Sequence, residues 1–147
     1  MKKNFIISID QGTTSSRAIL FNIKGKPIYS SQKEFTQYFP KSGWVEHNPE
    51  EIWSTTKKTL KNVISKAKRL KGKILAIGIT NQRETTVMWD KKTGKAVYRA
   101  IVWQDRRQEE FCKKLRKQNK ETLIFNRTGL LIDSYFSGTK IKWILDN

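Results

Sequence analysis

The sequence is poor in cysteine and histidine and has no long apolar run. Cys112 is the single cysteine and His47 the single histidine among 147 residues, so the chain by itself supplies neither an internal disulfide nor a Cys/His zinc site. One cysteine favours a reducing, cytoplasmic setting. The apolar stretch near the start is broken by Ser8 and Asp10, unlike a signal peptide, and no segment reaches the roughly 20 apolar residues that span a bilayer. We expect no membrane insertion.

Acidic residues are also scarce. Asp+Glu number 13 against 30 Lys+Arg, which gives a net charge of +17. Such an excess suits a nucleic-acid-binding module, because these cations displace counterions from phosphates. Most of them are lysines, however, in short runs spread along the chain, whereas base readout favours arginine. The pattern is more typical of a solvated surface, so we expect no nucleic-acid partner and keep a basic binding module as the weaker alternative.

Glycine and proline are too few for a disordered or collagen-like chain, at 8 and 3 residues. Hydrophobic residues make up 37% and aromatic residues 11%, which is enough to form a core. A length of 147 residues fits one ordinary domain. It is too short for a two-domain enzyme.

Hydrophobic patterning predicts three strands at the start of the chain. Residues 4–10 are an Ile-rich run typical of a central strand covered on both faces. Turns rich in Gly and Thr or Gly and Pro separate it from strands at 15–23 and 28–36. The chain therefore opens with an antiparallel β-meander.

A helix and a parallel strand are predicted next. Asn48 and Pro49 are typical of a helix start, and Gly72 would end a helix at 49–70. The inward side chains would be Trp53, Thr56, Leu60, Val63, Ile64 and Ala67. Residues 73–80 form a further apolar run, which we expect to be a buried strand parallel to the first.

The second half has weaker signals. Residues 85–90 and 96–103 flank a turn and predict a hairpin, Asp105 would cap a helix at 106–118, and a periodic helix begins near Ser137. No Rossmann or Walker A glycine pattern is present. The order β-β-β-α-β predicts an α/β domain of the actin-like or ribonuclease H-like ATPase class, with a mixed sheet that this chain leaves incomplete.

The first candidate site follows the first predicted strand, where residues 10–17 read DQGTTSSR. Gly12 lets the backbone come close to a ligand. Donors for phosphate oxygens would be Thr13, Thr14, Ser15 and Arg17. Asp10 is an anion where the Mg²⁺ of a nucleotide would bind, directly or through water. The same residues suit a plain hairpin turn with Asp10 in an Asx-turn, and both interpretations stay open.

The second candidate site follows the apolar run that ends at Thr80, at the carboxyl end of a strand where α/β proteins bind ligands. Arg83 and Glu84 offer a donor and an acceptor for the hydroxyls of a polyol. Both reach one ligand only if the strand has ended, because neighbours in a strand point to opposite faces. An ordinary exposed loop is the competing interpretation.

Two aromatic residues are further candidates. Trp103 offers an apolar wall for a sugar or polyol, and Tyr135 offers a phenol hydroxyl. Packing in a core is the more common fate of a tryptophan in such a run, and for Tyr135 the sequence leaves packing and ligand contact open. Arg106 and Arg107 are expected to be solvated or paired with carboxylates, and His47 receives no role.

Several separated blocks together resemble the FGGY family of carbohydrate kinases over essentially all of residues 4–147. They read IDQGTTSSR, GWVEHNPEEIW, AIGITNQRETTVMWD, AIVWQDRR and DSYFSGTKIKWILDN. The blocks NQRETT and SYFSGTK are similar to those of the glycerol-specific members.

This resemblance implies ATP-dependent phosphorylation of a terminal hydroxyl of glycerol, giving glycerol 3-phosphate. ATP and Mg²⁺ are the implied cofactors. The residues implied are Asp10 for Mg²⁺, Thr13, Thr14, Ser15 and Arg17 for the phosphates, Arg83, Glu84 and Tyr135 for the glycerol hydroxyls, and Trp103 for its carbons. A family member that uses another sugar or polyol is the alternative.

The resemblance also implies a larger enzyme. Family members have two actin-like domains, so residues 1–147 would be the N-terminal part of the first domain. The aspartate base, a second phosphate loop and the adenine pocket would lie beyond Asn147. We therefore assign no catalytic base here and expect the 147-residue chain to be inactive alone. The parent enzyme is implied to be a homo-oligomer.

Overall fold

The computed structural model describes residues 3–147, which form two compact units. Unit 1 holds the chain up to Thr36 together with Glu50–Gln82, and unit 2 holds Gln37–Pro49 and Arg83–Asn147. Each unit is therefore built from two separate stretches of the chain.

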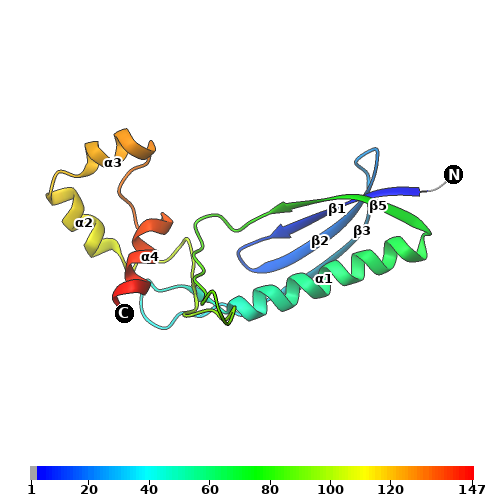
Figure 1. Ribbon diagram of the computed structural model, residues 1–147, viewed down its shortest axis with the longest axis horizontal. Coiled ribbons are helices and arrows are strands. Elements are labelled where there is room, and N and C mark those ends of the chain that lie inside the picture. Colours follow the sequence, from blue (N-terminus) through cyan, green and yellow to red (C-terminus); the bar gives the residue numbers. More distant parts are fainter. Residues whose placement is uncertain (1–2) are drawn as a thin grey trace. The chain divides into compact units, whose positions relative to one another are not determined.

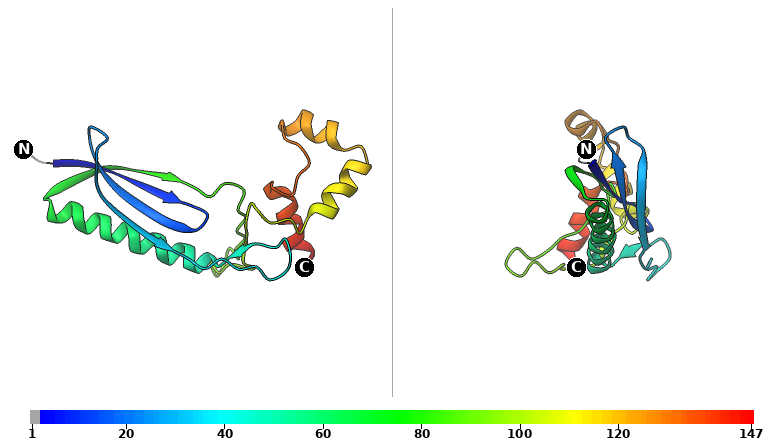
Figure 2. Two further views of the ribbon diagram at one scale, coloured as in Figure 1. Left: turned by 180° about the vertical axis from the view of Figure 1, so that it is seen from behind. Right: turned by 90° about the vertical axis from the view of Figure 1, so that its right-hand side faces the viewer.

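Unit 1 is a four-stranded mixed sheet with one helix on it. Its strands are β1 (Lys3–Gln11), β2 (Ser15–Asn22), β3 (Pro27–Glu34) and β5 (Gly72–Thr80), in the order β3-β2-β1-β5. β5 runs parallel to β1, and the other pairs are antiparallel. Helix α1 (Pro49–Arg69) runs along one face of the sheet (Figures 1 and 2). The predicted meander, helix and parallel strand are confirmed.

The core of unit 1 lies between α1 and the sheet. Alternate residues of β1 and β2 face the helix, as the two-residue period of a strand requires. The buried cluster consists of Phe5, Ile7, Ile9, Ala18, Leu20, Val63 and Ala67. β1 and β2 are therefore covered on the helix side.

The expected burial of β5 was wrong. Leu75, Ile77 and Ile79 are 51%, 48% and 74% exposed, because β5 is the edge of the described sheet and no described element covers its second face. Trp53, expected to face inward, is also 60% exposed, and Lys57 Nζ lies 5.5 Å from its ring centroid.

The end of α1 also differs from expectation. The helix stops at Arg69, and Lys71 takes the positive φ of 53°. Gly72 instead opens β5, where a Cβ would lie 2.1 Å from the Phe5 ring. Glycine is required there by close packing.

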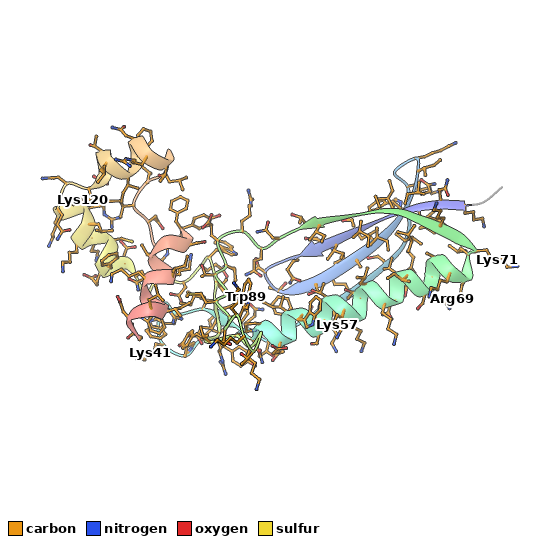
Figure 3. The ribbon with its side chains drawn as sticks, viewed as in Figure 1. Lys41, Lys57, Arg69, Lys71, Trp89 and Lys120 are labelled. Carbon is orange, nitrogen blue, oxygen red and sulfur yellow. The ribbon has the colours of Figure 1, made fainter. Side chains whose placement is uncertain are left out.

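The basic face of α1 supports a solvated surface. Lys57 and Arg69 extend from α1 away from the sheet (Figure 3).

No helix within residues 3–147 has the length and apolarity to cross a membrane.

Unit 2 joins a small ribbon to three helices. Strands β4 (Glu46–His47) and β6 (Ala100–Ile101) pair antiparallel. The helices are α2 (Glu109–Lys117), α3 (Glu121–Thr128) and α4 (Ser137–Asp146). The predicted hairpin appears only as β6 and the isolated bridges Thr86↔Ile101 and Trp89↔Ala96.

Asp105 was wrongly expected to cap a helix. Helix α2 begins at Glu109, and its N-cap position, Gln108, makes no side-chain capping bond. The Asp105 carboxylate instead accepts hydrogen bonds from the backbone of Val45 and from Arg107. Buried charge pairing, rather than helix capping, holds this aspartate.

Candidate functional site

The β1–β2 turn is narrow and closed by its own backbone. Gly12 N–H donates to Ser15 O at 3.0 Å, and a Cβ on Gly12 would lie 3.2 Å from the same oxygen. Thr13 is half-buried and Thr14 exposed, whereas Ser15 is buried and its hydroxyl accepts a hydrogen bond from Gln32 Nε2. The turn thus presents its two threonines where the backbone bends most tightly.

Asp10 and Arg17 flank this turn on neighbouring strands. They are register partners in the β1–β2 ladder, and their side chains form a 3.2 Å ion pair that is 35% exposed at Asp10 and 44% at Arg17. Exposed ion pairs contribute little stability, so a bound ion can separate the two groups at small cost.

The described residues fit a magnesium ion held mostly by other ligands. No group of three or more potential metal-binding side chains occurs within residues 3–147, and Asp10 is the one carboxylate among residues 10–17. Mg²⁺ keeps several waters and commonly binds proteins through one or two carboxylates plus substrate phosphates. A single carboxylate is compatible with that mode.

Gln11 anchors the turn to α1, a role that the sequence did not reveal. Its Oε1 accepts hydrogen bonds from Ser16 Oγ at 3.0 Å and from Thr56 Oγ1 at 2.7 Å, and Ser16 also bonds Thr55 at 2.9 Å. Gln11 Nε2 is buried without a hydrogen-bond partner in the described chain. These contacts fix the turn against the first turns of the helix.

Glu84 lies in the loop after β5, in unit 2. β5 ends at Thr80, so the condition for Arg83 and Glu84 to serve one ligand is met. Glu84 has a φ of 60°, a conformation that is uncommon for a residue other than glycine. Its Oε2 accepts hydrogen bonds from Ser137 N at 2.8 Å and Ser137 Oγ at 2.7 Å. The carboxylate therefore sits at the N-terminus of α4, where negative charge is favoured.

Trp103 and Tyr135 are brought together near that carboxylate. Their ring centroids lie 6.0 Å apart in an edge-to-face arrangement, and Tyr135 precedes Ser137 by two residues. Both side chains are half-buried. Neither Glu84 Oε1 nor the Tyr135 hydroxyl has a hydrogen-bond partner within residues 3–147, so both remain available to a ligand beside an aromatic wall.

Arg83 is not joined to this cluster. Its side chain is exposed and makes no ion pair or hydrogen bond within the part of the chain that the structure describes. The structure thus gathers three of the four predicted polyol residues and leaves Arg83 in solvent.

Lys140 was missed by the sequence analysis. Its side chain is 1% exposed, and its Nζ donates a hydrogen bond to the carbonyl oxygen of Tyr135. Burial lowers the pKa of Lys140 to about 8, while the negative charges of Glu84, Asp105 and Asp133 act in the opposite direction. No local signal marks it, because a lysine in a surface helix is expected to face solvent.

A family pattern matches almost the whole chain. Residues 5–147 match the FGGY family of carbohydrate kinases, N-terminal domain. The chain is also similar to proteins named glycerol kinase. It is 60% identical over 147 residues to that of Oceanobacillus iheyensis, covering 100% of this chain and 29% of the relative. It is 58% identical over 145 residues to that of Bacillus cereus strain AH187, covering 99% and 29%. The chain thus spans 29% of the length of these relatives.

Solved structures agree with this similarity. The chain superposes on the crystal structure of Plasmodium falciparum glycerol kinase with ADP at a TM-score of 0.92 and 36% identity, covering 99% of this chain and 29% of that one. A gluconate kinase from Lactobacillus acidophilus gives a TM-score of 0.88 at 21% identity, covering 99% and 29%. The second match shows a shared fold. The predicted actin-like α/β fold class is confirmed.

Proposed function

This chain belongs to the FGGY family of carbohydrate kinases, and from that premise we propose that it forms part of an ATP-dependent kinase that phosphorylates glycerol to glycerol 3-phosphate. Within that enzyme, residues 1–147 are the N-terminal part of the first of two domains. The similarity to glycerol kinases at 58–60% identity supports this assignment.

One observation supports a small polyol as the substrate. Glu84 Oε1 and the Tyr135 hydroxyl are free to bond a ligand beside the ring of Trp103. A small polyol needs hydrogen-bond partners for its hydroxyls and an apolar surface for its carbons. Arg83 joins the site in this proposal when a ligand is bound, since its guanidinium has no competing partner within residues 3–147.

The β1–β2 turn is the proposed phosphate site. Thr13, Thr14 and Ser15 donate to the phosphates of ATP, and Arg17 offsets their charge. Asp10 would hold Mg²⁺, which supplies charge stabilisation to the transferring phosphoryl group when bound. Phosphoryl transfer depends mainly on positioning and charge, and these residues perform both tasks.

No catalytic base is assigned within residues 1–147. We propose that it belongs to the larger part of the relatives that this chain does not cover, and that the whole enzyme is a homo-oligomer.

The test uses a chimeric kinase in which residues 1–147 replace the matching 29% of the Oceanobacillus iheyensis relative. ADP formation is measured with glycerol, xylulose and gluconate. Glu84→Gln and Tyr135→Phe are each expected to lower kcat/KM for glycerol about ten- to a hundredfold, because the first removes the negative charge of an acceptor and the second removes a hydroxyl.

Glu110→Gln is the matched control. Glu110 is an exposed carboxylate of α2 that pairs with Lys113 at 2.7 Å, so its loss should leave kcat/KM within about twofold. Faster turnover of xylulose or gluconate than of glycerol would overturn the substrate assignment. Unchanged glycerol kinetics in both site variants would overturn the polyol site.

A further inference from the structure

Among residues 3–147, Lys140 is the one lysine that the structure buries. Burying an ammonium group is unfavourable unless nearby groups compensate for the lost hydration. A lysine in a surface helix ordinarily extends its charge into water. The burial of Lys140 therefore requires an explanation.

The surroundings of Lys140 are those of the proposed polyol site. Its Nζ donates to the carbonyl oxygen of Tyr135 and lies 5.8 Å from the centroid of the Tyr135 ring. One helical turn earlier, Ser137 holds the Glu84 carboxylate through two hydrogen bonds. A single face of α4 thus fixes two residues that are 51 positions apart in the sequence.

The charges that face Lys140 come from three loops. Glu84 follows β5, Asp105 precedes α2 and Asp133 precedes α4, and all three favour its protonated form. Arg106 opposes that form. The ammonium therefore lies where the surrounding charge is mainly negative, and the Glu84 carboxylate contributes to that charge.

We propose that Lys140 is a positioning residue of the polyol site, whose buried positive charge holds Tyr135 and the Glu84 carboxylate in the geometry that binds glycerol. This inference rests on the proposed function. Lys140 contacts no reacting atom; it acts through the backbone of Tyr135 and the charge of Glu84. Its effect therefore falls on polyol affinity and leaves nucleotide affinity unchanged.

The first measurement compares Lys140→Met with Lys142→Met in the chimeric kinase. Lys142 lies on the same helix, is 46% exposed and pairs with Asp146 at 2.6 Å. Lys140→Met is expected to raise the KM for glycerol about tenfold and to leave the KM for ATP within about twofold. Lys142→Met should leave both constants within about twofold.

The second measurement is the pH dependence of the KM for glycerol. Because the pKa of Lys140 is lowered to about 8, the KM of the unmodified chimera should rise severalfold between about pH 7 and 9.5 as the ammonium loses its proton. Lys140→Arg keeps its charge throughout this range and should abolish the rise. Lys140→Met should show a high, flat KM.

The outcomes separate the two proposals. A chimera that turns over glycerol with a flat pH profile, and with the same KM for glycerol in Lys140→Met, would show that Lys140 only supports the fold. If Lys140→Met does not fold, the profiles of the unmodified chimera and of Lys140→Arg decide the question. A chimera without any glycerol turnover overturns the proposed function, and this inference falls with it.

Discussion

The guanidinium of Arg107 lies inside unit 2 between two carboxylates and an indole ring. Its side chain is 1% exposed and pairs with Asp105 and Glu46, both at 2.8 Å, while its Cζ lies 3.8 Å from the Trp44 ring centroid. The sequence predicted that this arginine would be solvated or paired, and pairing is what the structure shows. Its burial was not predictable, because Glu46 is 61 positions away.

Arg107→Met is expected to lower the free energy of unfolding of the purified chain by about 3 to 5 kcal/mol, because two buried carboxylates lose their cation. Urea denaturation followed by tryptophan fluorescence measures the change. Arg106→Met is the control, since Arg106 forms an exposed pair with Asp133 at 3.1 Å and its loss should cost about 1 kcal/mol or less. Equal losses in the two variants would contradict a special role for the buried pair.

The sequence predicts only some of the residues that form the candidate polyol site. Glu84 was identified because polar residues follow an apolar run, and Trp103 and Tyr135 because aromatic rings suit a polyol. Lys140 was missed because a lysine in a periodic helix is expected to face solvent. Its Nζ bonds the carbonyl oxygen of Tyr135 and is influenced by the charge of Glu84, a convergence of loops that local patterns do not encode.

Among the elements, β5 shows that hydrophobic patterning predicts a strand but does not predict its burial. Its apolar run correctly predicted a strand parallel to β1, since a helix connects the two. Burial is a property of neighbours, and no described element covers the second face of β5, so Ile79 is 74% exposed. The α1 boundaries were predicted within one residue because Asn48 and Pro49 are strong local signals.

Gly72→Ala should destabilise unit 1. The added Cβ would lie 2.1 Å from the ring of Phe5 and 3.0 Å from Lys3 O, and Phe5 is a buried core residue. The expected loss is about 1 to 3 kcal/mol in the free energy of unfolding, as for other overpacked cores. Thermal or urea unfolding of the purified chain measures it.

Gly78→Ala is the control within the same strand. A Cβ at Gly78 meets no atom within 4 Å, so this variant should be as stable as the parent or slightly more stable. If Gly78→Ala destabilises the chain as much as Gly72→Ala, a general intolerance of β5 to alanine, rather than contact with Phe5, is the cause.

At the scale of the whole molecule, the two candidate sites belong to different units. The β1–β2 turn, which is the proposed phosphate site, is built within unit 1, and the proposed polyol site of Glu84, Trp103 and Tyr135 is built within unit 2. The sequence did not predict that residues 37–49 join residues 83–147, because that union rests on the short β4–β6 pairing and on side-chain contacts between distant positions, such as the pair of Arg107 with Glu46. Two-residue strands are too short to leave a pattern.

The last prediction concerns the catalytic capacity of the 147-residue polypeptide. We expect it to show no glycerol-dependent ADP formation by itself, while the chimeric kinase is active. Transfer requires positioning of both substrates together with a base for the acceptor hydroxyl. Residues 10–17 contain one carboxylate, Asp10, and the carboxylate of the proposed polyol site, Glu84, is already committed to Ser137 through Oε2.

A contaminating host kinase is the main risk in this assay, and the site variants remove it. Activity from a host enzyme would be the same in preparations of the parent chain, Glu84→Gln and Tyr135→Phe. Activity that belongs to the chain would fall in both variants. Turnover by the parent chain at the rate of the chimera, lost in Glu84→Gln, would therefore contradict the prediction and would place a base within residues 1–147, with Glu84 as the first residue to test for that role.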